Sequence, residues 1–185
     1  MERADKDLAF MLRYENVAWY DEGEVRVLDR RVYPAKIEFV VCKTVEDVAS
    51  AIRDMVTQST GPYTLAPMGM ALAAWKCRDM GREEKKRYLE DSSRIIYSSR
   101  PTTTKRMKML TEACIPVALE AFEEGKRADE AVRDFVVEMN NARYNRVRDA
   151  AKYLVEKFPQ NGTVMTQCYA ETILGMMLLE CRERG

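Results

Sequence analysis

The sequence predicts an α+β fold in which a small antiparallel β-sheet is followed by a helical bundle. Strand-like segments near the N-terminus are joined by a glycine turn, and apolar residues recur at helical spacing over residues 44–158. Residues 163–183 then read as a strand leading into a helix. We therefore expect an N-terminal domain over residues 1–160 and, over residues 161–185, the start of a second domain that the chain does not complete.

The predicted sheet comes from three short segments. Residues 16–20 and 24–28 alternate apolar and polar side chains, and Asp21–Gly23 between them is a hairpin signal. Residues 37–42 are rich in β-branched and aromatic side chains, which are typical of strands.

The predicted bundle opens at Thr44–Asp47, which has the spacing of a capping box. Apolar residues continue at helical spacing to Val56, and Thr57–Pro62 breaks the helix. Pro116 is expected to kink a later helix, because proline lacks the N–H of a helical hydrogen bond. The polar run Asn140–Arg146 is interpreted as a solvated helical face, with a cleft or a subunit interface as the alternative. Further helices are predicted at residues 67–78, 83–97, 101–124, 128–158 and 170–183.

Composition restricts the class of protein. The chain has 185 residues, 46% of them hydrophobic, so it can bury a core and disorder is not expected. Thirty basic and 30 acidic residues give a formal net charge of zero, which favours neither nucleic acid nor an anionic membrane as partner. The charged N-terminus lacks the apolar core of a signal peptide. These features predict a cytoplasmic protein.

The sequence contains no histidine and an odd number of cysteines, and both facts limit the catalytic and metal-binding chemistry that the chain can perform. Without histidine there can be no Ser–His or Cys–His pair, and without a CxxC pair neither a structural zinc site nor a disulfide framework is expected. Cys168 differs from the others because it lies where the predicted strand meets a helix, and a helix N-terminus lowers a thiol pKa. The alternative is a buried structural cysteine. The five are Cys42, Cys77, Cys114, Cys168 and Cys181, of which Cys77, Cys114 and Cys181 fall on apolar helical faces.

Several segments together resemble the methylthioribose-1-phosphate isomerase family, over what would be its N-terminal half. This family is related to ribose-1,5-bisphosphate isomerases and to the regulatory subunits of translation initiation factor 2B. The matching segments are Trp19–Asp29 with Tyr33–Pro34, Thr44–Met55 with Met68–Ala74, Ser99–Thr102, and Thr166–Cys168.

The resemblance implies an enzyme of methionine salvage that converts an aldose phosphate into a ketose phosphate, with no metal or organic cofactor. Cys168 matches the cysteine of the family's catalytic pair, whose aspartate would lie beyond Gly185, in a second chain or a missing Rossmann-like domain that begins near Thr163. Arg100 matches an arginine that contacts the phosphorylated substrate, a role suited to its planar fork of donors. The expected partners are a phosphorylated sugar, the C-terminal half and a second copy of the chain.

Two departures from the family pattern point to an altered substrate. The family's loop arginine is missing from Thr57–Pro62, and Gln58 is its nearest counterpart. Gln58, Ser59, Thr60 and Gly61 are interpreted as a substrate loop that binds an anion through backbone amides, with a plain turn between helices as the alternative. After Cys168, Tyr169 and Glu171 replace the family's asparagine and glycine. The other possibility is a non-catalytic regulatory or binding protein like the initiation factor subunits.

We expect the C-terminal segment to be covered by a partner. The strand predicted at residues 163–167 would have an unpaired edge, and such edges seek partners. We expect it to pair with another chain or, as the alternative, to be poorly ordered. An apolar face on the last helix should likewise be buried by a partner. That face comprises Ile173, Leu174, Met177, Leu178 and Cys181.

Overall fold

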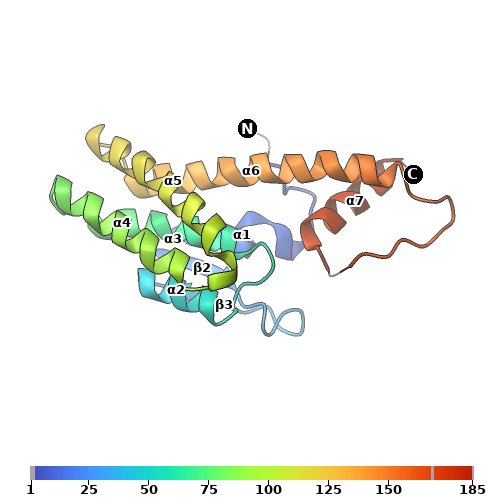
Figure 1. Cartoon of the computed structure of the whole chain (residues 1–185), viewed down its shortest axis with the longest axis horizontal. Coiled ribbons are helices and arrows are strands. Elements are labelled where there is room, and N and C mark those ends of the chain that lie inside the picture. The colour runs from blue at the N-terminus through green and yellow to red at the C-terminus, as the bar shows by residue number, and fades with distance from the viewer. Residues whose placement is uncertain (1–2, 168, 185) are drawn as a thin grey trace. The chain divides into compact units, whose positions relative to one another are not determined.

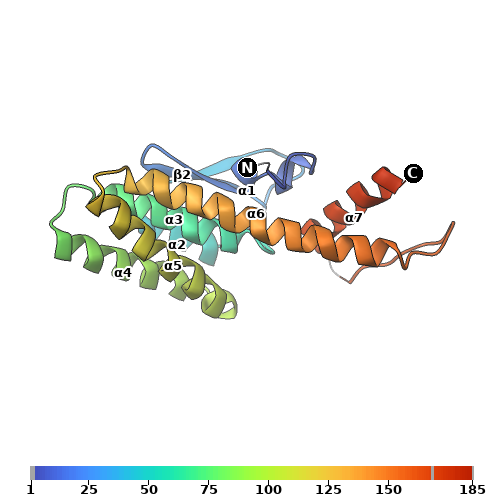
Figure 2. The ribbon, with the colours of Figure 1, turned by 90° about the horizontal axis from the view of Figure 1, so that it is seen from above.

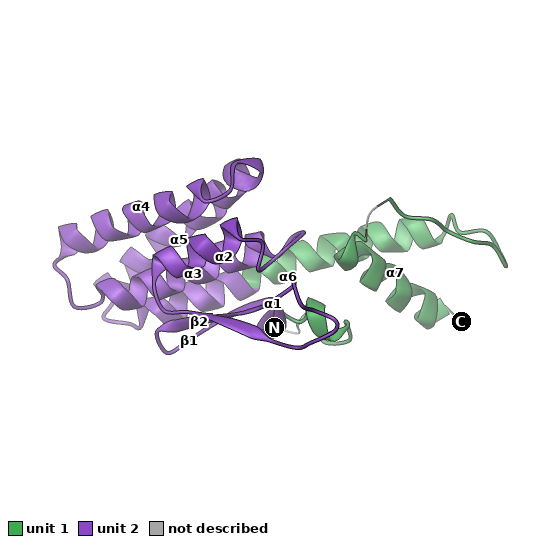
Figure 3. Cartoon of the chain, turned by 90° about the horizontal axis from the view of Figure 1, so that it is seen from below, with its two compact units in different colours: residues 1–13, 138–185 green, residues 14–137 purple. Residues whose placement is uncertain are grey.

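The computed structural model describes residues 3–167 and 169–184, which fall into two compact units. One unit extends from Tyr14 to Val137, and the other combines the N-terminal residues up to Arg13 with the chain from Glu138 onward (Figure 3). The first contains a three-stranded antiparallel sheet and several helices, so the α+β prediction is confirmed. The predicted boundary at residue 161 stays a prediction.

The sheet has the order β1-β2-β3, with β1 at Ala18–Asp21, β2 at Glu24–Leu28 and β3 at Phe39–Cys42. Tyr20 lies opposite Val25, and Val25 lies opposite Cys42, so these three side chains share one face of the sheet. All three are buried. The predicted hairpin is confirmed, although β1 begins two residues late because Tyr14–Val17 forms a short helix, α1.

The hairpin turn requires its glycine for two reasons. Gly23 has φ +89°, which side chains other than glycine rarely adopt. A Cβ at this position would also lie 2.5 Å from Nε1 of Trp75. The turn therefore packs directly against the C-terminal end of helix α3 (Pro62–Cys77).

Helix α2 (Val45–Arg53) begins with the predicted capping box. Oγ1 of Thr44 accepts a hydrogen bond from the Asp47 amide at 3.1 Å, and Oδ2 of Asp47 accepts one from the Thr44 amide at 2.9 Å. Val48 and Ile52 are fully buried on the inner face of this helix.

Helix α3 (Pro62–Cys77) lies between the sheet and two further helices, α4 (Arg82–Ser98) and α5 (Thr104–Glu123) (Figures 1 and 2). Most of its side chains are buried on all sides, including both Met68 and Met70. The predicted start at Pro67 is wrong, because the helix begins at Pro62 and continues through Pro67. Proline suits the first helical position, and burial of the surrounding side chains compensates for the missing amide at Pro67.

Gly69 marks the closest approach of other helices to α3. A Cβ there would lie 2.8 Å from Cγ1 of Val48 on α2 and 3.0 Å from Cδ1 of Ile96 on α4. Both distances are shorter than an ordinary contact between carbon atoms. The glycine therefore allows two helices to pack against the same turn of α3.

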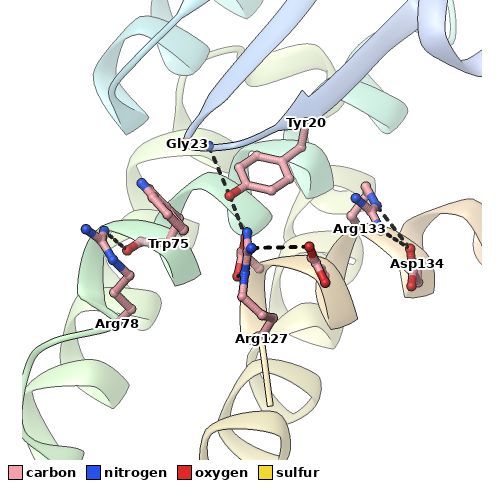
Figure 4. A network of polar contacts seen from close by, with 9 residues as sticks. Tyr20, Gly23, Trp75, Arg78, Arg127, Arg133 and Asp134 are labelled. Atoms are coloured by element: carbon pink, nitrogen blue, oxygen red, sulfur yellow. Dashed lines mark hydrogen bonds and ion pairs between the residues drawn. The ribbon is translucent and has the colours of Figure 1, made fainter. Parts of the chain in front are cut away.

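A buried polar network joins the hairpin to the first turn of α6 (Ala128–Val155) (Figure 4). The Tyr20 hydroxyl donates to Oδ2 of Asp129 at 2.7 Å and accepts from the Gly23 amide at 3.1 Å. Arg127 donates to both carboxylate oxygens of Asp129, at 2.6 and 3.1 Å, and its guanidinium lies 5.1 Å from the Trp75 ring. Burial opposes ionisation of Asp129, but the hydrogen bonds from Arg127 and Tyr20 outweigh it and lower the carboxyl pKa.

Unit 1 of Figure 3, which combines the N-terminal residues with the chain from Glu138 onward, contains a buried polar cluster that the sequence did not predict. The Tyr144 hydroxyl on α6 donates to the Leu12 carbonyl at 3.0 Å, and Oδ1 of Asn141 accepts from the Ala4 amide at 3.1 Å. Asn140, Asn141 and Tyr144 are each at most 3% exposed, so the interpretation as a solvated face is wrong for these three residues. The last two residues of the run, at 145 and 146, are exposed as predicted.

The buried side of α6 in this unit is therefore partly polar. Asn140, Asn141 and Tyr144 lie on it together with Ala151. The apolar side chains of Ala150 and Leu154 are exposed.

The strand predicted at residues 163–167 is not formed. Residues 162–166 have no regular secondary structure, and the side chains of residues 163–167 are all exposed. A strand requires a neighbouring strand to take its backbone hydrogen bonds, and the described part of the chain offers none in a ladder with this segment.

The predicted last helix is confirmed as α7 (Glu171–Arg184). On its predicted apolar face, Met177 is buried and Leu178 is 63% exposed, whereas Ile173, Leu174 and Cys181 are half-buried. A Cβ at Gly175 would lie 2.9 Å from Leu12 and 3.1 Å from Leu8, so the N-terminal segment packs closely on α7. The chain thus covers part of this face, and burial of the remainder by a partner stays a prediction.

We expect Asp129→Asn to lower the free energy of unfolding of the Tyr14–Val137 unit by about 1–3 kcal/mol, because the buried donors lose a charged acceptor. Asp134→Asn is the matched control, since that carboxylate is 68% exposed and also pairs with an arginine, Arg133. Urea unfolding followed by tryptophan fluorescence measures both, because Trp19 and Trp75 belong to this unit.

The free energy of unfolding that Asp129→Asn removes should depend on pH. Because folding lowers the Asp129 pKa, its contribution is complete above the unfolded pKa of about 4 and disappears as the pH falls through the folded value. The free energies of unfolding of wild type and Asp129→Asn should therefore approach each other as the pH falls. A difference that does not change between about pH 7 and pH 2 would contradict this account.

We expect Gly69→Ala to destabilise the same unit by about 1–2 kcal/mol, because overpacking outweighs the better helix propensity of alanine. In a Val48→Ala background, the nearest methyl group is gone and the same change should cost much less. Thermal and urea unfolding of the four variants of this cycle give the coupling energy. If Gly69→Ala lowered the free energy of unfolding equally with and without the Val48 side chain, the close approach of Gly69 to Val48 would not be what excludes a larger residue.

Candidate functional site

The candidate substrate loop joins α2 to α3 at one end of the helices of the Tyr14–Val137 unit (Figure 1). Ser59 is exposed and has φ +56°, in the left-handed region, whereas Gln58 and Thr60 are half-buried. Gly61 is buried and is the N-cap residue of α3. The loop is thus a tight turn with two hydroxyl side chains, on Ser59 and Thr60.

Few backbone amides of this loop remain available for an anion. The Gly61 amide donates to the Gln58 carbonyl at 2.9 Å, and the Tyr63 amide donates to the Thr60 carbonyl at 3.0 Å. Pro62 has no amide hydrogen. A ligand at this helix start would meet mainly the amides and hydroxyls of Ser59 and Thr60.

The shape of the loop depends on Gly61. A Cβ at this position would lie 1.9 Å from Oγ1 of Thr57, which is itself buried. The Arg30 amide donates to the Val56 carbonyl at 2.8 Å, which fixes the chain just before the loop. The loop is therefore fixed at its start by the hydrogen bond to Val56 and at its end by the close packing of Gly61 against Thr57.

Arg100 lies in the turn between α4 and the short 3-10 helix η2 (Pro101–Thr103). Its carbonyl accepts hydrogen bonds from the Thr103 and Thr104 hydroxyls, at 3.3 and 3.0 Å, so its backbone is well fixed. Its side chain is half-buried. In the part of the chain that the structure describes, no carboxylate lies within 4.0 Å of its guanidinium.

The start of α5 lies beside the start of α3. Cζ of Arg106 on α5 is 4.6 Å from the ring centroid of Tyr63, which is in the first turn of α3. This contact joins the two segments that carry the predicted substrate-binding residues. No motif in the sequence marks Arg106, so it was not among the predicted site residues.

Cys168, the predicted catalytic residue, lies outside the described residues. Of its neighbours, Tyr169 is 51% exposed and Glu171, the first residue of α7, is only 6% exposed. The Glu171 carboxylate acts electrostatically on the phenol of Tyr144, whose pKa is raised chiefly by burial. Glu171 therefore belongs to the same buried polar cluster as Tyr144.

The other cysteines are poor candidates for chemistry. Cys42, Cys77 and Cys114 are fully buried, and burial raises the pKa of Cys42 to about 12 and that of Cys77 to about 11. Cys181 is half-buried on α7. Over residues 3–167 and 169–184, no group of three acidic or cysteine side chains could hold a metal ion. Within the same ranges, no helix is long and apolar enough to cross a membrane.

A groove lies away from the candidate loop, between the N-terminal end of α4 and the C-terminal end of α5. It is a groove of 440 Å³, and Lys85 and Phe122 face each other in it, with Nζ 4.3 Å from the ring centroid. Arg82 and Glu123 form an ion pair across its edge. Its charges are largely compensated, and none of the predicted site residues lines it.

Comparison with known proteins supports the resemblance in the sequence. The methylthioribose-1-phosphate isomerase of Cereibacter sphaeroides is 27% identical over 158 residues, which are 82% of this chain and 42% of that protein. The methylthioribose-1-phosphate isomerase of Natranaerobius thermophilus is 33% identical over 86 residues, which are 45% of this chain and 24% of that protein. No family model matches the chain.

Among solved structures, translation initiation factor eIF-2B subunit delta from A. fulgidus superposes with a TM-score of 0.68 at 21% identity. The superposition covers 92% of this chain and 52% of that chain. The chain is thus related to the methylthioribose-1-phosphate isomerases and shares the fold of this factor subunit. It spans about two fifths of the length of the curated relatives that it matches over most of its own length.

Proposed function

We propose that this chain forms the substrate-loop portion of a sugar-phosphate aldose–ketose isomerase of the methylthioribose-1-phosphate isomerase type, with an altered substrate. The observation that carries the proposal is the contact between Tyr63 and Arg106, because it joins the loop at residues 58–61 to the segment that follows Arg100. Sequence similarity to curated isomerases provides the reaction class.

The proposed site divides its roles among few side chains. Arg100, which has no acidic partner within 4.0 Å among the described residues, would bind the phosphoryl group through its planar fork of donors. The hydroxyls of Ser59 and Thr60 would bind sugar or phosphate oxygens, with Gln58 beside them. Gly61 would keep the loop in place through its close packing against Thr57.

Proton transfer would depend on Cys168 and on a carboxylate supplied by a second, Rossmann-like domain. Conversion of an aldose to a ketose moves hydrogen between neighbouring carbons of one molecule, so it needs no external oxidant. The exposed segment at residues 163–167 would become a strand when that domain supplies a neighbour to pair with it. The complete protein would act in the cytoplasm, in methionine salvage or a related step, and as an oligomer.

A non-catalytic binding or regulatory role is the second candidate. Two observations favour it: the loop has a neutral Gln58 where the family has arginine, and Glu171 is buried beside Tyr144. A protein of this kind would bind a phosphorylated ligand at the same loop without turning it over.

We expect the chain to bind a sugar phosphate in isothermal titration calorimetry, with methylthioribose 1-phosphate and ribose 5-phosphate as the two probes. Arg100→Gln should weaken this binding about tenfold or more, because a charge-assisted hydrogen bond to phosphate is lost. Arg87→Gln is the control, since it removes the same charge from an exposed position on α4. It should leave the affinity within about twofold.

An absence of binding by the wild-type chain would contradict the proposal. If the two variants had equal affinities, a role for Arg100 in phosphate binding would be excluded. Binding by a protein that is completed by its second domain, but without turnover, would favour the non-catalytic candidate.

A further inference from the structure

The substrate loop at residues 58–61 contains no cationic side chain, and some of the backbone amides at this helix start are already engaged in hydrogen bonds. Gln58 is neutral, and the amides of Gly61 and Tyr63 already donate to the carbonyls of Gln58 and Thr60. A phosphoryl group carries up to two negative charges at neutral pH and binds best to cationic donors. If the loop binds such a group, the cation must come from another element.

Arg106 is the side chain that the fold brings to this place. It lies in the first turn of α5, and its guanidinium is held 4.6 Å from the ring centroid of Tyr63, one residue after Pro62. Stacking on an aromatic ring leaves the N–H groups at the edge of the guanidinium plane free to donate. Tyr63 thus positions a fork of donors beside the turn that contains the loop.

The surroundings of Arg106 leave its charge uncompensated. The first turn of α5 contains no acidic residue, and within the described ranges no carboxylate lies within 4.0 Å of Arg106 or its neighbour Lys105. Cations in the first turn of a helix are unfavourable, because the helix dipole places positive charge there. Helix stability therefore does not explain Arg106, whereas an anionic ligand would.

We infer that Arg106, positioned by Tyr63, is the specificity-determining residue that binds the ligand's phosphoryl group in place of the loop arginine that this chain lacks. The inference rests on the proposed function, because it concerns the same site. It also implies that phosphate is bound from the α5 side of the loop rather than by the loop itself.

The test compares ligands with and without phosphate. Isothermal titration calorimetry with methylthioribose 1-phosphate, ribose 5-phosphate and unphosphorylated methylthioribose gives the phosphate-dependent part of the affinity for each variant. Arg106→Gln should weaken binding of the phosphorylated sugars about tenfold or more and leave the unphosphorylated sugar unchanged. Arg106→Lys should recover part of the loss, because the charge remains without the planar fork.

Matched variants separate a specific contact from a general effect of charge. Lys105→Gln removes the same charge one residue away, where the structure gives no aromatic contact, and should change the affinity less than about threefold. Tyr63→Phe keeps the ring and should bind the phosphorylated sugars like wild type. Tyr63→Leu removes the ring and should weaken their binding, but by less than Arg106→Gln does. Tryptophan fluorescence confirms that each variant is folded.

The outcomes distinguish this inference from the proposed function. If Arg106→Gln weakens binding no more than Lys105→Gln while Arg100→Gln still does, the inference is overturned and the proposed function stands. Equal losses for phosphorylated and unphosphorylated sugars would also overturn it, since they indicate a purely structural role. If the wild-type chain binds none of the three sugars, the inference and the proposed function both fail.

Discussion

The all-round burial of α3 is the constraint on which the Tyr14–Val137 unit depends. An amphipathic helix packs through one face, but α3 contacts the sheet on one side and α2, α4 and α5 on the others. Its small residues permit this, and Gly69 permits it most directly, because Val48 and Ile96 occupy the space of its missing side chain. The positions of the other elements follow from their contacts with this helix.

Both ends of α3 carry polar groups, and they serve different purposes. At its C-terminal end, Trp75 packs against Gly23 and Arg127, next to the hydrogen bonds between Tyr20 and Asp129. In that network Tyr20 and Asp129 are buried and hydrogen-bonded, while Arg127 covers them from the surface, so the network stabilises the fold. At its N-terminal end the cations have no acidic partners within 4.0 Å among the described residues, so charge remains available for a ligand.

Local signals made much of this fold predictable. The capping box at Thr44 and the hairpin at Gly23 each depend on a few neighbouring residues, and both are confirmed. The start of α3 was missed because Pro67 looks like a helix start, and only tertiary packing shows that the helix passes through it. The segment at residues 163–167 has the composition of a strand, but a strand also needs a partner, and sequence composition does not contain one.

The site was predictable only in part, for a similar reason. Arg100 and the loop at residues 58–61 came from family motifs, which preserve residues that act in relatives. Arg106 matches no such motif, and its relevance appears only when α5 is placed beside Tyr63. Asn140 and Tyr144 were assigned to a solvated face because their side chains are polar, whereas the structure buries them under the N-terminal segment.

If a phosphorylated ligand binds where the starts of α3 and α5 meet, an NMR titration of the chain with methylthioribose 1-phosphate and with ribose 5-phosphate will reveal it through backbone amide shifts. We expect the shifts to concentrate in residues 57–65 and 100–107. Shifts concentrated instead at the groove lined by Arg82, Lys85 and Phe122, or no shifts at saturating ligand, would contradict the proposal.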